Sequence, residues 1–175
     1  MFKEVIFLDI MLYHAFLPEN HQHHVPFKDI MEDGIKSTTQ SNHVYGNGGS
    51  IHLEITERFR PVGAADWIDF KNTVRANITN RFSKSFCFPV FTNKIKVFNS
   101  EISLNIYDQA FYEDLKYTDE EALNFDTGKS LEYWIKEYWQ SMVSLEQYIE
   151  KKPYKEPEIL IFEDVPRQII KVCEK

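Results

Sequence analysis

Apolar residues recur in this chain with two different periods, and the order in which these periods follow one another is the feature that most limits its fold. Alternation of apolar and polar residues predicts a half-buried strand, whereas apolar residues three and four positions apart predict one face of a helix. Strand patterns lie at both ends of the chain and in its middle, with helical patterns inserted unevenly. Because regular strand–helix alternation is missing, we predict one α+β domain over residues 1–175 with a mixed or antiparallel sheet.

The strand patterns differ in clarity. Residues 50–57 alternate most regularly, with Ile51, Leu53 and Ile55 on one face and polar side chains on the other. Residues 86–107 are rich in Phe, Val and Ile but contain Pro and Asn, so they predict two or three short strands. The remaining strands are expected at 3–14, 159–162 and 169–173.

Helices are expected in three places. The first would begin at Pro26 and end at Gly34, and the second would occupy 64–82, where apolar residues are three and four positions apart. A long third helix at 130–150, capped by its first serine, would lie within a helical insertion at about 100–150. The apolar stripe of this third helix comprises Trp134, Tyr138, Met142, Leu145 and Ile149.

The composition indicates a folded core. Hydrophobic residues make up 43% of the chain and aromatic residues 15%, which argues against intrinsic disorder. No apolar run is long enough to predict a membrane span, and the first apolar segment lacks the basic start of a signal peptide. The cysteines, Cys87 and Cys173, are too few for a disulfide framework. We therefore expect a reducing, cytoplasmic setting, with Cys87 as a core residue.

Charge is distributed unevenly along the chain. The formal net charge is -7, yet residues 58–96 contain eight Lys and Arg side chains against two Asp. A basic zone in an acidic protein can bind a polyanion such as nucleic acid, and it would also suit an acidic protein. The alternative interpretation is a solvated helix face with no binding role.

Three parts of the sequence, taken in order, carry residues suited to chemistry. The first is Leu-Tyr-His-Ala at 12–15, and the second combines 27–35, which closes in Gly-Ile, with the Gly-rich segment 44–53. The third runs from Glu through Val-Pro to Ile-Ile at 158–172. This arrangement resembles the three motif regions of ADP-ribosyltransferases of the His-Tyr-Glu class, which includes the poly(ADP-ribose) polymerases and the DNA-modifying toxins.

The resemblance implies roles for individual residues. Glu158 would bind the 2′-hydroxyl of the nicotinamide ribose of NAD and stabilise the positive charge that develops as nicotinamide departs. His14 would hydrogen-bond a ribose hydroxyl, and Tyr45 would stack on the nicotinamide ring. The backbone would approach the ligand closely at Ala15, Gly46, Gly48 and Gly49.

The resemblance also implies a split, twisted sheet whose central cleft holds NAD. ADP-ribose would pass to a macromolecular acceptor, or to water, and nicotinamide would be released. The basic segment 58–96 favours a nucleic-acid acceptor, or an acidic protein, with Arg58 or Arg60 positioning a phosphate or pyrophosphate.

A metal site is a further hypothesis. Histidines cluster at His21–His24, and with His14, His43 or His52 they could bind zinc or iron through neutral imidazoles. Helical His-x-x-x-His and paired-cysteine patterns are absent from the sequence, so a polar surface loop is the favoured interpretation and no metal is expected.

A non-enzymatic binding module is the main alternative to an enzyme. Tyr133, Ile135 and Trp139 flank the apolar stripe of the helix expected at 130–150. Aromatic side chains outside such a stripe can face a partner, such as an antitoxin, an immunity protein or a second copy of the chain. The sequence contains no phosphate-binding loop, nucleophile elbow or Rossmann fingerprint.

Overall fold

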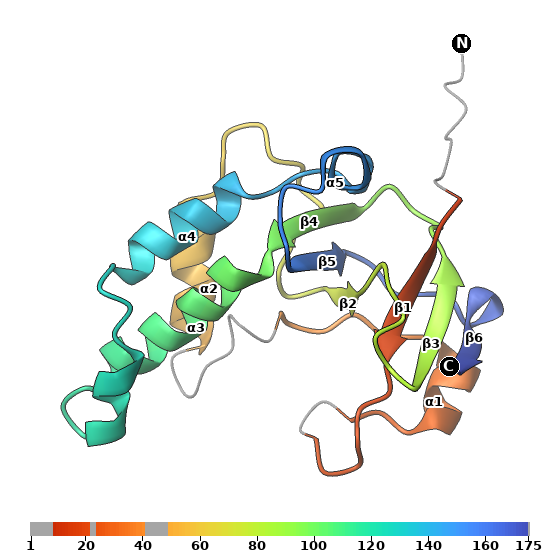
Figure 1. The fold of residues 1–175 in the computed structure, drawn as a ribbon, viewed down its shortest axis with the longest axis horizontal. Helices are drawn as coiled ribbons and strands as arrows, with labels where there is room; N and C mark the ends of the chain where they lie inside the picture. Colours follow the sequence, from red (N-terminus) through yellow and green to blue (C-terminus); the bar gives the residue numbers. More distant parts are fainter. Residues whose placement is uncertain (1–8, 22–23, 41–48, 175) are drawn as a thin grey trace.

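The computed structural model describes residues 9–21, 24–40 and 49–174. These residues form two small antiparallel sheets and a group of helices (Figure 1), which confirms the predicted α+β class with antiparallel pairing. The strands are β1 (Met11–Ala15), β2 (Val74–Ala76), β3 (Lys84–Pro89), β4 (Ile95–Asn99), β5 (Pro157–Ile161) and β6 (Lys171–Glu174). The helices are α1 (Phe27–Asp33), α2 (Gly49–Arg58), α3 (Ser100–Leu115), α4 (Leu131–Gln140) and α5 (Leu145–Lys151), with 3-10 turns η3 (Glu120–Phe125) and η4 (Arg167–Ile169).

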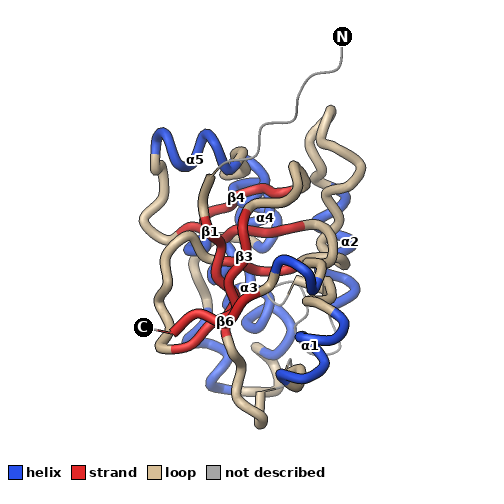
Figure 2. The backbone as a smooth tube through the Cα atoms, turned by 90° about the vertical axis from the view of Figure 1, so that its right-hand side faces the viewer, coloured by secondary structure: helices blue, strands red, loops and turns tan. Residues whose placement is uncertain are grey.

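The two sheets have the strand orders β1-β3-β6 and β2-β5-β4. One bridge, Tyr13 with Asn77, connects β1 of the first sheet to the residue after β2 of the second. Figure 2 shows the strands of the two sheets running at a steep angle to each other. In Figure 1, α2, α3 and α4 gather on the side of the second sheet, whereas α1 lies beside the first.

The sheet β2-β5-β4 separates two apolar clusters because its side chains alternate between two faces. Ile159 and Ile161 point into a cluster that also contains side chains of the first sheet, α1 and α5. Leu160 points into the other cluster, which α3 and α4 cover. Glu158 has the same parity as Leu160, and it is therefore expected on the face covered by α4.

The helix and strand predictions near the chain ends are confirmed where the structure describes them. Helix α1 follows Pro26 and ends at Gly34, whose positive φ of 83° suits glycine. Strands β5 and β6 fall within a few residues of the predicted segments. Strand β1 forms the end of the segment predicted at 3–14, of which residues 1–8 lie outside the described part of the chain.

The prediction of a strand at 50–57 is wrong, because Gly49–Arg58 forms helix α2. A segment of eight residues can fit both the two-residue period of a strand and the three-to-four-residue spacing of a helix. Thr56 is buried, and Leu53 and Phe59, each three positions away, are partly buried against the second cluster. The Nε1 atom of Trp139 donates to the Thr56 carbonyl at 2.9 Å, which ties α2 to α4.

The prediction of a helix at 64–82 is also wrong. The Asp69 carboxylate accepts hydrogen bonds from the Lys71 backbone N–H at 2.9 Å and from the Asn72 side chain at 2.5 Å. This local turn competes with helix formation. Strand β2 then follows, with Val74 and Ala76 buried on either side of an exposed Arg75.

The middle of the chain contains more helix than the sequence predicted. Strands β3 and β4 lie within the segment 86–107 or at its edge, but Asn99 caps helix α3, its side chain accepting from the Glu101 N–H at 3.1 Å. The long helix predicted at 130–150 is two helices. Ser130 caps α4 as expected, and Ser144 begins α5 with a capping box.

The two cysteines are paired. A disulfide joins Cys87 of β3 to Cys173 of β6, with their Cα atoms 6.0 Å apart. The sequence, with two cysteines, predicted no disulfide framework and did not predict this bond, which weighs against the argument for a reducing compartment. Cys87 is buried in the core as predicted. Within the described residues, no helix is sufficiently long and apolar to cross a membrane.

Candidate functional site

The candidate site lies where β1 separates from β2. Tyr13 and Asn77 exchange two backbone hydrogen bonds, and farther along the same edge of β2 Thr38 and Thr73 do the same. Between these two bridges the carbonyl oxygen of Arg75 lies 2.7 Å from Nδ1 of His14. An imidazole therefore occupies the gap in the backbone ladder that opens between β1 and the segment carrying Thr38.

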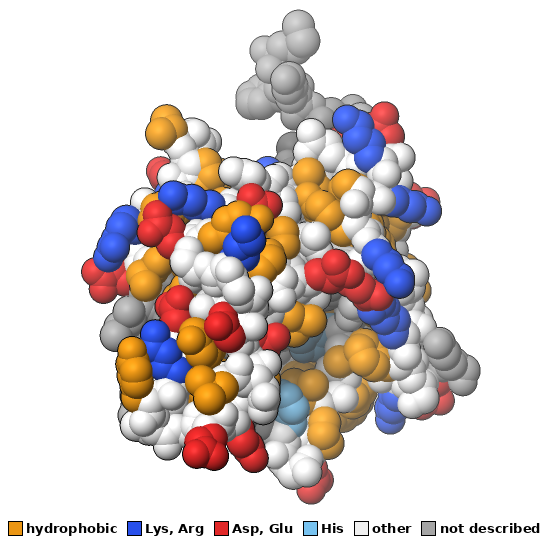
Figure 3. Space-filling model, turned by 60° about the vertical axis from the view of Figure 1, so that its left-hand side comes forward, with side chains coloured by type: hydrophobic (Ala, Val, Ile, Leu, Met, Phe, Trp, Pro, Cys, Tyr) orange, Lys and Arg blue, Asp and Glu red, His pale blue; other side chains and the backbone are white. Residues whose placement is uncertain are grey.

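A cavity of about 1140 Å³ opens at this gap. Its polar wall includes His14, Thr38, Gln40, Arg75 and Asn77. The space-filling view in Figure 3 shows a hollow in which histidine and hydrophobic side chains lie. The apolar wall of the cavity is formed by Phe16, Leu17, Val25, Phe27, Ile30 and Phe86. The cavity thus combines a surface for a flat apolar group with a surface for a polar one.

The surroundings of His14 favour a neutral imidazole with its proton on Nδ1. Burial lowers its pKa below the ordinary value of 6.5, and the hydrogen bond to Arg75 opposes that shift only in part. The Arg75 carbonyl can only accept, so Nδ1 carries the proton. Nε2 is then a hydrogen-bond acceptor, which is the form that can accept from a ligand hydroxyl.

Glu158 lies at the start of β5 and is completely buried. Its Oε1 atom accepts from Gln40 Nε2 at 2.5 Å and from the Tyr138 hydroxyl at 2.6 Å. Its Oε2 atom lies 3.4 Å from Nη2 of Arg75. Gln40 and Arg75 both line the cavity, so the carboxylate lies directly behind the polar cavity wall.

Arg75 contacts both of the predicted site residues His14 and Glu158. Its carbonyl oxygen lies 2.7 Å from Nδ1 of His14, and its guanidinium group lies 3.4 Å from Oε2 of Glu158. The imidazole and the carboxylate thus contact the backbone and the side-chain end of the same residue. Strand β2 positions them because it lies between β1 and β5.

The other predicted ligand-binding residues have different positions. Ala15 lines the cavity beside His14. Tyr45, Gly46 and Gly48 lie outside the described residues. Arg58 ends α2, is exposed, and is not among the described residues that line the cavity.

Arg60 serves a local role. Its guanidinium group pairs with Glu57 at 2.9 Å, and it donates to the carbonyl oxygens of Ala65 and Ile68. It also lies 5.4 Å from the ring centre of Trp139. These contacts stabilise the turn after α2. The Arg60 guanidinium group is thus already hydrogen-bonded within the protein.

Acidic side chains from outside the basic segment 58–96 pair with several of its cations. Arg75, Arg81 and Lys84 lie within 4 Å of Glu158, Glu156 and Glu174, respectively. Arg75 and Arg81 nevertheless line the cavity. The positive charge of the segment is therefore distributed over several ion pairs, two of which border the cavity.

The histidine loop contributes two side chains to the cavity, His21 and His24. Nδ1 of His24 lies 2.9 Å from the carbonyl oxygen of Leu17, which holds the loop in a turn. Across the described part of the chain, no group of three or more His, Cys, Asp or Glu side chains is arranged to bind a metal ion.

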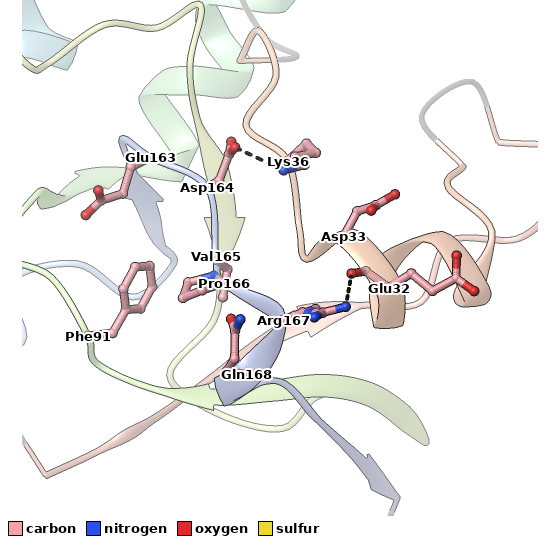
Figure 4. A pocket seen from close by; sticks show the side chains of 10 residues that line it. All are labelled: Glu32, Asp33, Lys36, Phe91, Glu163, Asp164, Val165, Pro166, Arg167 and Gln168. Carbon is pink, nitrogen blue, oxygen red and sulfur yellow. Dashed lines mark hydrogen bonds and ion pairs between the residues drawn. The ribbon is translucent and has the colours of Figure 1, made fainter.

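A second, shallower pocket of about 740 Å³ adjoins the first at Asp33 and Lys36. Figure 4 shows it between the end of α1 and the turn after β5. Lys36 lies 3.5 Å from Asp164, and Arg167 donates to the Glu32 carbonyl at 3.0 Å. Both cations of this pocket are thus already engaged by the protein.

The surface proposed for a binding module is only partly as predicted. Tyr133 is exposed, but Ile135 and Trp139 are buried in the second cluster, so their assignment to a partner surface is wrong. Other large apolar side chains are exposed on α3, on η3 and in the turn between them. They are Leu104, Tyr107, Tyr117, Leu123 and Phe125.

Three residues of the site were missed from the sequence: Gln40, Arg75 and Tyr138. The sequence around Gln40 gives no sign that this residue belongs to a site, because it follows an irregular extended segment with no recognisable motif. The sequence placed Arg75 in the basic segment 58–96 and within a predicted helix, whereas it belongs to β2, and it placed Tyr138 in the core stripe of the helix expected at 130–150. No protein-family model, curated protein or solved structure matches this chain.

Proposed function

We propose that this protein is an NAD-dependent ADP-ribosyltransferase whose site is the gap between β1 and β2. The single observation that supports this most strongly is the double contact of Arg75, with His14 through its carbonyl and with Glu158 through its guanidinium. The two sheets, whose described strands β1 and β2 are connected at the Tyr13–Asn77 bridge, would correspond to the split sheet of ADP-ribosyltransferase-like folds.

The chemistry requires an anion beside the ribose. When the glycosidic bond of NAD breaks, nicotinamide leaves with the bonding electron pair and positive charge develops on the ribose. The Glu158 carboxylate would stabilise that charge in a site from which water is excluded. A nucleophile of the acceptor, or water, would then bond to the ribose carbon and lose a proton.

His14 and Ala15 would orient the substrate. A neutral imidazole with Nε2 unprotonated can accept a hydrogen bond from a ribose hydroxyl, and burial favours this neutral form. The backbone of Ala15 borders the same cavity and would meet the nicotinamide amide. The aromatic wall that includes Phe16 and Phe27 would accommodate a flat ring of the ligand.

NAD can reach Glu158 only if Gln40 and Arg75, which cover it in the polar cavity wall, move aside. Glu158 is sealed behind Gln40 and Arg75, whose side chain is 46% exposed. A guanidinium group binds phosphate oxygens well, so Arg75 would turn from Glu158 toward the pyrophosphate of NAD. Its departure would make the carboxylate accessible to the ribose.

The acceptor that we propose is a nucleic acid, with an acidic protein as the alternative. Lys84 lies 5.2 Å from the ring centre of Phe16 and 5.9 Å from that of Phe27. Arg81 borders the same cavity. Aromatic rings beside cations at a cavity are suited to unpaired bases and phosphates.

Release of nicotinamide from NAD tests this function. Wild-type protein should release nicotinamide, and Glu158→Gln should lower kcat by about 100-fold or more, because the amide keeps the shape and removes the charge. Glu156→Gln is the matched control, because this exposed carboxylate pairs with Arg81 at the surface. Chromatographic assay of nicotinamide distinguishes the variants, and equal rates in all three proteins would refute the assignment of Glu158.

A binding module is the second candidate, because large apolar side chains are exposed on α3, η3 and α4. We would then expect no nicotinamide release from any form of the protein. The wild-type chain should self-associate in sedimentation experiments, and Leu123→Lys should prevent this. A monomeric wild-type protein that releases nicotinamide would exclude the second candidate.

A further inference from the structure

We propose that Tyr138 is a positioning residue that holds the Glu158 carboxylate from the side opposite the cavity, an inference that rests on the proposed function. Tyr138 belongs to α4, in the helical part of the chain, and its side chain is fully buried. Its hydroxyl donates to Glu158 Oε1 at 2.6 Å. The orientation of the proposed catalytic carboxylate of Glu158 would therefore depend on α4, through a residue that does not line the cavity.

The partners of Glu158 fall into two kinds. Gln40 and Arg75 belong to the cavity wall and would have to move when substrate enters. Tyr138 belongs to the core, where its ring stacks on Phe98 with centroids 4.5 Å apart and also contacts Phe70. Close packing fixes this ring, so its hydrogen bond would persist after the wall opens.

A fixed donor on Oε1 has two consequences for the proposed reaction. It holds the carboxylate in one orientation and directs Oε2, the oxygen now facing Arg75, toward the entering ribose. It also stabilises the ionised carboxylate after the guanidinium has turned away. Burial and the neighbouring Glu158 raise the pKa of the Tyr138 phenol well above its ordinary value, so the phenol remains a donor.

Tyr138→Phe tests the inference because it removes one hydroxyl and keeps the ring. We expect kcat for nicotinamide release to fall about 10- to 100-fold, the range for a lost hydrogen bond to a charged group. The KM for NAD should change less than about twofold, because the ground-state contacts remain. The acidic limb of the kcat–pH profile should move to higher pH.

The matched control is Tyr148→Phe. Tyr148 also donates its hydroxyl within the core region, to the Tyr154 carbonyl at 2.8 Å, but in α5 and away from Glu158. This variant should keep the wild-type kcat and pH profile. If Tyr138→Phe also keeps them while remaining folded, the positioning role is wrong.

A measurement that needs no activity separates this inference from the proposed function. The carbon-13 NMR chemical shift of the Glu158 carboxyl can be measured in ligand-free protein, with Glu158→Gln identifying its signal. Arg75 from β2, Tyr138 from α4 and the neutral Gln40 are among the described groups that contact it. We expect Tyr138→Phe, and not Tyr148→Phe, to move this signal, because a donor to Oε1 is lost; an unchanged chemical shift would overturn the inference even if the protein is an active enzyme.

A second variant covers the case in which Tyr138→Phe does not fold. Replacement of Tyr138 by 3-fluorotyrosine makes the phenol a stronger donor and should move the carbon-13 signal of the Glu158 carboxyl away from its wild-type position. An unchanged chemical shift would count against the inference. If wild-type protein releases no nicotinamide, the proposed function fails separately, and the chemical shift still decides whether Tyr138 controls the carboxylate.

Discussion

Arg75 contributes to the site through two chemically different groups. Its backbone carbonyl fixes the tautomer of His14, and its side chain covers Glu158. A substitution at this position therefore changes only the second contact, since every residue supplies a carbonyl. The side chain can thus serve as a movable cover while the imidazole stays oriented.

The pKa of His14 leads to a prediction about stability. Because burial lowers this pKa in the folded protein, the unfolded chain binds more protons as pH falls below the ordinary value. The stabilisation associated with a neutral His14 is therefore present above about pH 6.5 and is lost as pH falls. We would measure the free energy of unfolding by urea denaturation between pH 5 and 8. As pH falls, it should decrease less for His14→Asn than for wild type, because asparagine cannot protonate. The same decrease in the two proteins would contradict this.

Individual site residues were only partly predictable from the sequence. His14 and Glu158 were predicted from a resemblance that depends on their order in the chain, and both contact Arg75 of β2. Gln40 and Tyr138 contact Glu158 from positions 118 and 20 residues away in the sequence. Such contacts depend on how the segments fold together, which local patterns do not contain.

Helix α1 and the segment after it form the element that supports the cavity wall. Gly34 ends α1 with a φ of 83° and a ψ of -176°, a conformation almost restricted to glycine. Ile35 then pairs with Val165, and the segment continues to Thr38 and Gln40 at the cavity. The exit from α1 thereby determines where Gln40 lies.

Gly34→Ala should disturb this element. A Cβ at Gly34 would collide with the Val165 carbonyl oxygen, whereas a Cβ at Gly63, which has a similar φ of 86°, meets no atom within 4 Å. Gly63→Ala is therefore the control. It should lower the free energy of unfolding only by the cost of a non-glycine residue in the left-handed region, about 1–2 kcal/mol. Urea denaturation should show a larger decrease in the free energy of unfolding for Gly34→Ala. Equal losses in the two variants would show that the Val165 contact is unimportant.

Secondary structure was predictable where a local signal agreed with the tertiary environment. Pro26 and Gly34 marked α1 correctly, as Ser130 marked the start of α4. At 50–57 and 64–82 the apolar spacing was real but the inferred element was wrong. Those side chains enter the core from a helix in the first case and from a turn followed by β2 in the second, which spacing alone does not distinguish.

At the scale of the whole molecule, the site lies where the two sheets separate. The disulfide between Cys87 and Cys173 fastens β6 to β3 within the first sheet. The aromatic cluster around Phe70 and Tyr138 fastens α4 to the second sheet. Side chains of both sheets also share the first apolar cluster, and among the described strands β1 and β2 share a single bridge. The proposed movement of the Arg75 side chain would leave these contacts in place.

The central claim is that His14 and Glu158 act on one molecule of NAD, and a crystal structure of Glu158→Gln with NAD tests it most directly. We predict NAD in the cavity between β1 and β2, with ribose hydroxyls within hydrogen-bond distance of His14 Nε2 and the residue 158 side chain, and with Arg75 turned toward the pyrophosphate. NAD bound elsewhere, or residue 158 still sealed behind Gln40 and Arg75 with NAD present, would contradict the account.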